Sequence, residues 1–117
     1  MKHTIEVNGI KLYAFHGCLP EETKIGGNYV VDVHIVTNFQ KAAEEDSLED
    51  TIDYVDVNRI VKEEMAIPSK LIEHVGQRIL VRMENELKNL DGVRIKITKI
   101  CPPINGDVEN VAIIIER

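Results

Sequence analysis

The sequence predicts an α+β fold in which two helices pack on one face of an antiparallel sheet. Three observations support this fold class. Apolar and polar residues alternate over residues 28–37 and 93–97, as in strands with one buried face, and residues 111–115 form a short apolar run that also indicates a strand. Apolar residues recur instead at helical spacing over 57–65 and 72–87. The start of the chain also alternates, so the order is strand, strand, helix, helix, strand, strand, which predicts a two-layer ββααββ sandwich.

The first strand region covers residues 4–14, and its alternation slips at Asn8-Gly9. This pair is typical of a two-residue hairpin turn, although each arm would have only about three or four residues. A single strand interrupted by a bulge fits the pattern equally well. A loop rich in glycine and proline (HGCLPEETKIGG, residues 16–27) leads to the next strand, whose shared face carries Tyr29, Val31, Val33 and Ile35.

The two helices are preceded by residues that commonly cap helices. Residues 38–52 form an acidic connection without a clear period, and Asp53 then stands where it can cap the first helix. Ser69 stands where it can cap the second helix, and Asp91-Gly92 ends that helix.

The last strand contains the sequence VAIII at residues 111–115. Val111, Ile113 and Ile115 are expected on the buried face, but the opposite face is apolar as well. A sheet with one face in water does not require this, so the second face indicates burial against another subunit.

The composition is that of a globular protein, with 44% hydrophobic and 29% charged residues, and the length of 117 predicts one domain over residues 1–117. A net charge of −6 without a basic patch argues against binding to nucleic acid or to an anionic membrane. No signal peptide and no run approaching ~18 apolar residues is present, so we expect a cytoplasmic protein. Cys18 and Cys101 form no C-x-x-C pair, which is typical of reduced thiols.

One residue breaks the strand pattern near the C-terminus. Val93, Ile95 and Ile97 share the apolar face, and the next residue on that face is Lys99. The simpler explanation is that the alkyl stem packs on the sheet while the ammonium reaches solvent at the strand end. Alternatively, Lys99 is half-buried and performs acid–base chemistry, for which lysine suits because its pKa shifts readily on burial.

Three further residues have both a structural and a functional interpretation. Glu73, in the opening turns of the second helix, is stabilised there by the helix dipole, and its carboxylate can also accept two parallel N–H bonds from a planar amino-heterocycle. Tyr54, in the first turn of the first helix, either covers the core or presents its hydroxyl to a ligand. Glu22 is either a solvated loop charge or a polar group of a site.

No metal site or nucleotide site is predicted. His16 and Cys18 have the chemistry of zinc ligands, but no H-E-x-x-H, no paired C-x-x-C and no third ligand accompanies them. The sequence also lacks a P-loop, a G-x-G-x-x-G and a G-x-S-x-G motif, so phosphate binding by a glycine-rich loop and serine-nucleophile chemistry have no support.

Four segments together resemble one family. They are GIKLYAFHGCLPEETKIGGNYVVDV, DTIDYVDV, LIEHVGQRI and KITKICPPINGDVENVAIIIER, and they extend over nearly the whole chain. The specific parts are the F-H-G-x-L-x-E-E loop, the D-Y pair, the I-E-H helix start and a lysine shortly before P-P-I. In this combination and order the chain resembles the dihydroneopterin aldolase family of folate biosynthesis.

The resemblance implies the tunnelling fold, whose ββααββ order agrees with the order predicted above. It also implies that four subunits join edge to edge into a barrel and that two such rings stack as an octamer, with each site between neighbouring subunits. The implied partners are a small pterin substrate and further copies of the chain.

The resemblance also assigns roles to residues. Glu73 matches the anchor of the pterin ring, and Ile72 supplies backbone contacts beside it. Lys99 matches the catalytic lysine, and Tyr54 matches a tyrosine near the reacting side chain. Glu22 matches a loop glutamate that completes the polar end of the site, so Glu22 and Tyr54 would contribute to both binding and catalysis.

The implied reaction is retro-aldol cleavage of 7,8-dihydroneopterin, with side-chain epimerisation as a possible second outcome. No cofactor or metal is expected, because the C6=N5 imine of the substrate accepts the electrons of the broken bond. One departure is that Ile100 follows Lys99 where many members have proline, which we expect to alter loop rigidity. The alternatives are a dihydroneopterin triphosphate 2′-epimerase, which requires a cationic pocket, and a pterin-binding subunit without turnover.

Overall fold

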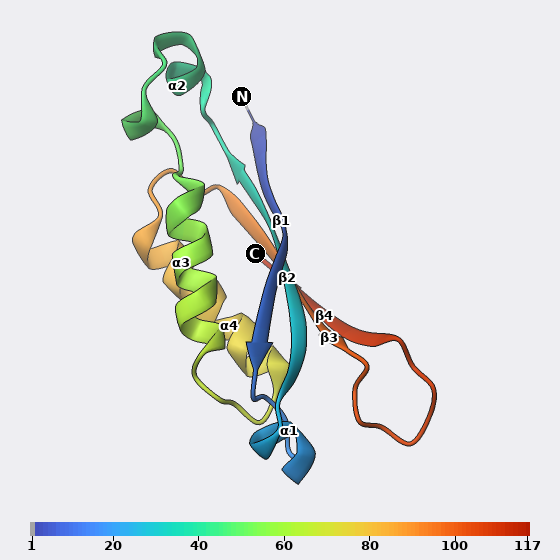
Figure 1. The fold of residues 1–117 in the computed structure, drawn as a ribbon. Coiled ribbons are helices and arrows are strands. Elements are labelled where there is room, and N and C mark those ends of the chain that lie inside the picture. The colour runs from blue at the N-terminus through green and yellow to red at the C-terminus, as the bar shows by residue number, and fades with distance from the viewer. Residues whose placement is uncertain (1) are drawn as a thin grey trace.

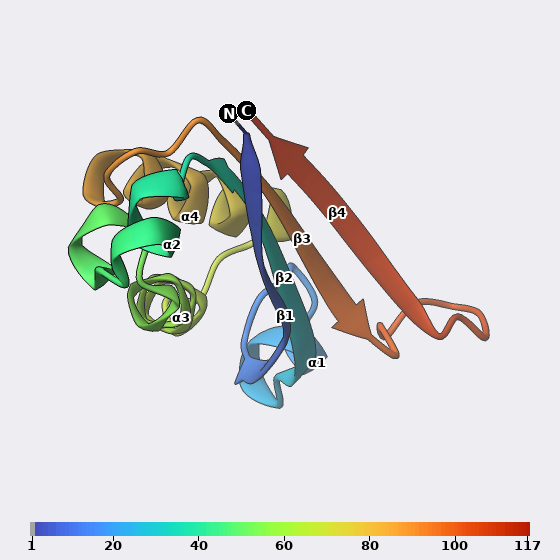
Figure 2. The same cartoon turned by 90° about the horizontal axis from the view of Figure 1, so that it is seen from above.

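The computed structural model describes residues 2–117 and contains one antiparallel sheet, covered on one face by helices (Figure 1, Figure 2). The α+β fold class and the ββααββ order of the main elements are therefore confirmed. The strands are in spatial order β1 (His3–Ala14), β2 (Gly27–Thr37), β3 (Gly92–Ile100) and β4 (Asn110–Glu116), and the two long helices are α3 (Tyr54–Met65) and α4 (Ile72–Glu86).

The irregularity at Asn8-Gly9 is a bulge within β1. The pairing of β1 with β2 shifts register between Val7 and Ile10, and β1 continues on both sides of the shift. Gly9 has a φ of 69°, a left-handed conformation that glycine adopts at little cost. The bulged strand is thus confirmed, and the hairpin turn is excluded.

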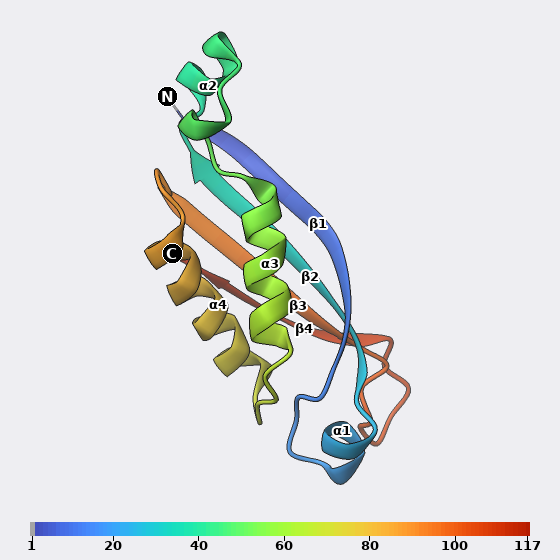
Figure 3. The ribbon, with the colours of Figure 1, turned by 60° about the vertical axis from the view of Figure 1, so that its left-hand side comes forward.

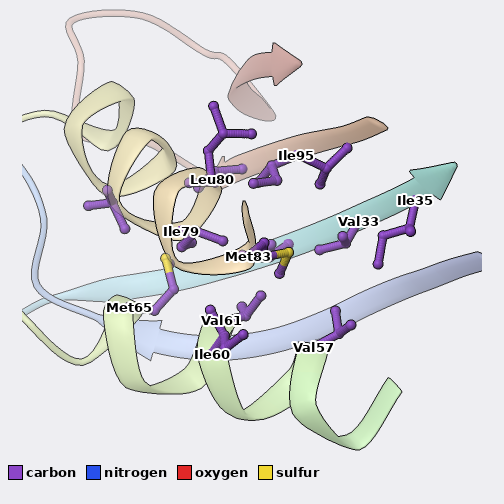
Figure 4. Close-up of a cluster of buried hydrophobic side chains, with 14 of the residues drawn as sticks. Val33, Ile35, Val57, Ile60, Val61, Met65, Ile79, Leu80, Met83 and Ile95 are labelled. Atoms are coloured by element: carbon purple, nitrogen blue, oxygen red, sulfur yellow. The ribbon is translucent and has the colours of Figure 1, made fainter. Parts of the chain in front are cut away.

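The core lies between the sheet and the two helices. Helix α3 contributes Ile60 and Met65, α4 contributes Ile79 and Met83, and the strands contribute residues such as Ile95 (Figure 4). Each of these side chains is almost completely removed from water. Burial of an aliphatic side chain of this size stabilises a fold by about 1.5–3 kcal/mol, so this cluster fixes the helices on the sheet.

The helix starts differ from the prediction at one of two places. The Asp53 carboxylate accepts a hydrogen bond from the Val55 amide at 2.9 Å, so the predicted cap of α3 is confirmed. The predicted cap at Ser69 is wrong, because α4 begins at Ile72 after Leu71, which makes no side-chain cap. The backbone of Ser69 is instead bonded to the segment after β1, which holds it outside the helix.

Two segments predicted to be loops contain short helical turns. The 16–27 loop contains α1 (Pro20–Lys24), and the acidic connection contains α2 (Gln40–Glu45) and the 3₁₀ turn η1 (Leu48–Asp50). None of these three turns has a buried residue. Turns without a buried stripe leave no apolar period in a sequence, which explains why the pattern did not reveal them.

Strands β1 and β4 are the two edges of the sheet, and β4 is the more exposed. Ile113 and Ile115 are half-buried beneath α4, as predicted. Val111 is 40% exposed in the single chain, so the prediction that it is buried is wrong. The loop between β3 and β4 projects beyond the end of the sheet (Figure 1).

Within residues 2–117, no helix has both the length and the apolar character that a membrane crossing needs.

Candidate active site

A pocket of about 300 Å³ lies where the helix-covered face of the sheet ends. We call it the Lys99 pocket, and its lining comes from the segment after β1, the start of α4, the end of β3 and the β4 edge. Its volume is at the lower end of the range for small-molecule sites. The lining residues are Gly17, Cys18, Glu22, Lys70, Leu71, Ile72, Glu73, Lys99, Pro102, Ile104, Val111 and Ile113.

Lys99 and Glu22 form an ion pair in this pocket. The Lys99 Nζ lies 2.5 Å from the Glu22 Oε2, and the two side chains are 15% and 11% exposed. Lys99 is opposite Tyr29 of β2 and Val111 of β4, so it continues the row of side chains that faces the helices. It therefore breaks the apolar pattern because the covered face reaches a pocket there.

Glu22 is held by its own turn as well as by Lys99. Its Oε1 accepts a hydrogen bond from the Leu19 amide at 3.3 Å. Burial alone would raise the pKa of the Glu22 carboxyl, but the hydrogen bond from Lys99 and the amides of Leu19 and Cys18 bring the pKa below its ordinary value. Glu22 is accordingly an anion at neutral pH.

Gly17 allows this approach of Glu22. Gly17 has a φ of 140°, and a Cβ atom at this position would overlap the Glu22 carboxyl group. Only a residue without a side chain satisfies both conditions. The F-H-G part of the loop thus has a direct geometric role in forming the Lys99 pocket.

The carbonyl of His16 fixes the other side of Lys99. It accepts hydrogen bonds from the Lys99 Nζ at 3.4 Å and from the Tyr29 hydroxyl at 3.0 Å. Burial raises the pKa of the Tyr29 phenol, so its hydroxyl stays protonated and can act as the donor. Lys99 is therefore held between the Glu22 carboxylate and the His16 carbonyl.

Helix α4 supplies the opposite wall of the pocket. Ile72 is buried at the first position of the helix, and the Glu73 side chain is exposed in the first turn. The N-terminal end of a helix favours a carboxylate, because the free backbone amides carry a partial positive charge. A flat ligand with neighbouring N–H groups could bind Glu73 through two parallel hydrogen bonds while its other end approaches Lys99.

Tyr54 lies outside the Lys99 pocket of its own chain. It begins α3 next to η1, at the end of the molecule where α2 lies, whereas α1 with Glu22 is at the other end (Figure 1, Figure 3). Its side chain is 66% exposed. The structure thus brings together Lys99, Glu22, Ile72 and Glu73 but leaves Tyr54 on a separate surface.

Sequence reasoning missed the contribution of His16 to the pocket. The sequence pattern indicates His16 only as a possible zinc ligand with Cys18, yet its imidazole is fully buried and bonded to the Ser69 backbone. The single signal was its place in the F-H-G motif, and that signal does not reveal a partner 53 residues away. No group of three or more potential metal-binding side chains occurs in the described part of the chain.

Comparisons with known proteins agree on one family. The family model described as dihydroneopterin aldolase (FolB) matches residues 5–116. A curated dihydroneopterin aldolase from Staphylococcus epidermidis is 35% identical, covering 100% of this chain and 98% of the relative. The corresponding Bacillus subtilis protein is 32% identical over 97% of this chain and 95% of its own length.

The solved structures show the same fold. The Escherichia coli dihydroneopterin aldolase, determined in complex with neopterin, superposes with a TM-score of 0.88 at 24% identity and covers 98% of each chain. A family match over nearly all residues, full-length relatives above 30% identity and a common fold lead to one conclusion. The chain belongs to the dihydroneopterin aldolase family.

Proposed function

We propose that this protein cleaves 7,8-dihydroneopterin by a retro-aldol reaction to 6-hydroxymethyl-7,8-dihydropterin and glycolaldehyde, a step of folate biosynthesis. Membership of the family supports this reaction class. The observation that carries the assignment to a site is the position of the Lys99–Glu22 pair, which lines the same pocket as Ile72 and Glu73. A lysine and a carboxylate beside a second carboxylate that can anchor the ring supply groups suited to proton transfer in this reaction.

In this proposal, the pterin ring binds at the start of α4. The Glu73 carboxylate accepts hydrogen bonds from two neighbouring N–H groups of the ring, and the backbone next to Ile72 contacts the ring edge. The side chain of the substrate then extends towards Lys99 and Glu22 at the other end of the pocket.

The substrate supplies its own electron sink. The unprotonated amine of Lys99, acting through a water molecule, takes the proton of the C2′ hydroxyl as the C1′–C2′ bond breaks and glycolaldehyde forms. The bonding electrons pass through the C6=N5 imine and give an enamine, which the Tyr54 hydroxyl helps to protonate at C1′. Each positioned proton-transfer group typically contributes about 10²- to 10⁴-fold to the rate. Return of the aldehyde in the opposite orientation would re-form the bond with inverted configuration, so we include side-chain epimerisation in the proposal.

We further propose that the active site lies between two subunits of a tetrameric ring or of an octamer made of two rings. Tyr54 starts α3 near α2, whereas Lys99 is bonded to Glu22 of α1 at the opposite end of the molecule (Figure 1). Both residues can therefore reach one substrate if two chains meet. The open β1 and β4 edges support this assembly, because closing a sheet into a barrel removes its edges. The free thiols of Cys18 and Cys101 support a cytoplasmic location.

The triphosphate epimerase is not favoured by the charges of the pocket. The lining of the Lys99 pocket has two lysines, Lys70 and Lys99, and two glutamates, Glu22 and Glu73. Lys99 is already paired with Glu22. A triphosphate instead requires an excess of positive charge.

The decisive experiment incubates chelator-treated protein with 7,8-dihydroneopterin and identifies the products by chromatography. For the wild type we expect hydroxymethyldihydropterin and glycolaldehyde. Lys99→Ala should keep pterin affinity and lose at least about 10²-fold in kcat, because a proton-transfer group is removed. Glu73→Gln should instead weaken binding about 10-fold or more, because one of its acceptors becomes a donor facing a ring N–H.

Calorimetry with neopterin separates the two effects. Retained turnover in Lys99→Ala would refute the role of Lys99, and unchanged affinity in Glu73→Gln would refute the anchor. Tight binding by a wild type that forms no product would indicate a binding subunit without turnover.

A further inference from the structure

We propose that neutral His16 is a positioning residue that holds the Lys99 half of the pocket against the α4 half. This inference deepens the proposed function and rests on it, because it concerns the geometry of the same site. His16 lies immediately after β1, outside any helix or strand, and touches both halves through different atoms. Its imidazole binds the segment before α4, whereas its carbonyl binds Lys99.

Two hydrogen bonds join the segment after β1 to Ser69. The His16 Nδ1 accepts from the Ser69 amide at 3.1 Å, and the Gly17 amide donates to the Ser69 carbonyl at 2.8 Å. Ser69 precedes Ile72 by three residues, so this pair of bonds sets where α4 starts. The position of Glu73 relative to the loop therefore depends on the His16 side chain.

The carbonyl of the same residue sets the position of Lys99. It accepts hydrogen bonds from the Lys99 Nζ and from the Tyr29 hydroxyl. Displacement of residue 16 would consequently move Lys99 relative to Glu73. Misplacement of reacting groups by about 1 Å can cost on the order of 10²-fold in rate, so the contact bears directly on catalysis.

Only the neutral imidazole fits this arrangement. An acceptor at Nδ1 places the single proton of the neutral ring on Nε2, which is buried without a hydrogen-bond partner of normal geometry within residues 2–117. Protonation would put a second N–H at Nδ1, and two donors would then face each other at Ser69. The charged ring would therefore separate the two halves of the pocket.

The surroundings of His16 keep it neutral. Burial lowers the pKa of the imidazole below its ordinary value, and the positive charges of Arg78 on α4 and Lys99 on β3 lower it further, against an opposing effect of the Met65 carbonyl at the end of α3. Arg78 is paired with Glu64 of α3, and Lys99 with Glu22 of α1. On β2 the facing group is Tyr29, whose hydroxyl stays protonated.

The matched variants are His16→Leu and His16→Asn. The two new side chains have the same branched shape and neither titrates, but only asparagine offers an oxygen that can accept from the Ser69 amide. We expect His16→Leu to lose about 10- to 100-fold in kcat with a smaller change in KM, and His16→Asn to recover most of this loss. A role in core filling alone would affect both variants alike.

The acid limb of the pH–rate profile gives a second readout. In the wild type, kcat/KM should fall as pH decreases below the ordinary histidine value of about 6.5, because the imidazole becomes charged. In His16→Asn this fall should disappear, which leaves the fall caused by Glu22 below about pH 4.5. This comparison remains decisive if His16→Leu does not fold.

His3 provides a control. Its Nδ1 accepts a hydrogen bond from the Phe39 amide at 3.1 Å, the same type of contact outside the Lys99 pocket. His3→Leu should lower stability without changing kcat.

Amide hydrogen exchange gives a readout that does not depend on turnover. The Ser69 amide should exchange faster in His16→Leu than in the wild type, and at the wild-type rate in His16→Asn.

The possible failures can be told apart. An inactive wild type would refute the proposed function, and exchange at Ser69 would then decide whether His16 joins the two segments. Equal kcat in His16→Leu and His16→Asn, or an acid limb that persists in His16→Asn, would overturn the positioning role.

Discussion

At the scale of single residues, the Lys99–Glu22 pair links stability to catalysis. The two side chains are mostly buried, and their charges are balanced by each other. Removing one partner of such a pair leaves a desolvated charge without compensation, which costs more than a surface ion pair contributes. Glu22 therefore has a measurable effect on folding in addition to its proposed part in the reaction.

We predict that Glu22→Gln lowers the free energy of unfolding at neutral pH by on the order of 1–3 kcal/mol. The pKa of Glu22 is lowered in the folded state, so its stabilising effect is present above the ordinary value of 4.5 and is lost as pH falls through the folded pKa. The difference between wild type and variant should accordingly shrink below about pH 4.5. Denaturant unfolding at a series of pH values and one protein concentration measures this difference in the free energy of unfolding.

The neighbouring Glu21 supplies the control for this measurement. It is exposed in the same short helix, and Glu21→Gln should change stability by no more than about 0.5 kcal/mol. A difference between wild type and Glu22→Gln that stays constant down to acidic pH would contradict the role of the Glu22 charge.

Local patterns reveal Lys99, whereas Glu22 is placed beside it only by the family resemblance and the link from His16 to Ser69 is not predicted, for a physical reason. A cation on an apolar strand face breaks a local rule, so Lys99 is visible from its immediate neighbours alone. The contact with Glu22 joins residues 77 positions apart, and the bond from His16 to Ser69 spans 53 positions. Neither contact leaves a local period, so no pattern within one segment of the sequence can show them.

At the scale of elements, the first turn of α3 has both a structural and a functional part. Asp53 caps the helix through the Val55 amide, and Tyr54 is the first helical residue. Without a cap, the first turn of a helix loses one of the few partners that its free amides have. The position of the Tyr54 ring therefore depends on the Asp53 carboxylate.

We predict that Asp53→Ala lowers the free energy of unfolding by about 1 kcal/mol and reduces kcat on the order of 10-fold, because the turn that carries Tyr54 frays. Asp53→Asn keeps an oxygen acceptor and should restore both quantities to near wild-type values. Denaturant unfolding and steady-state kinetics are the measurements. If Asp53→Ala lost stability but kept full kcat, Tyr54 would not depend on this cap.

The elements also show how far local patterns predict structure. The long helices and the strands are predictable because each buries a periodic face, and the cap at Asp53 follows local chemistry that the structure retains. Ser69 has the same local chemistry, yet its backbone is bonded to the segment after β1. At that position a tertiary contact overrides the capping preference, and no local pattern can reveal this.

At the scale of the whole molecule, residues 2–117 have two unpaired sheet edges and a proposed catalytic residue far from the Lys99 pocket. An edge strand such as β4 presents free backbone groups, which another strand can pair. Joining the β1 edge of one copy to the β4 edge of the next uses two different surfaces of each chain, and such a head-to-tail interface gives a ring where the rotation between copies closes. A ring of this kind would also bring Tyr54 of one chain to Lys99 of the next.

Mixed assemblies test this arrangement directly. We predict that Tyr54→Phe and Lys99→Ala are each nearly inactive alone, but that co-assembly of equal amounts restores about one quarter of wild-type kcat. In a shared site, one chain supplies Lys99 and its neighbour supplies Tyr54. In an equal mixture, half of the chains retain Lys99 and the other half retain Tyr54, so one site in four has both residues. If both residues acted within one chain, no chain in the mixture would have both, and activity would stay at the level of the separate variants.

Mixing the two variants without dissociation and reassembly is the control, and an equal activity before and after reassembly would exclude a site shared between subunits.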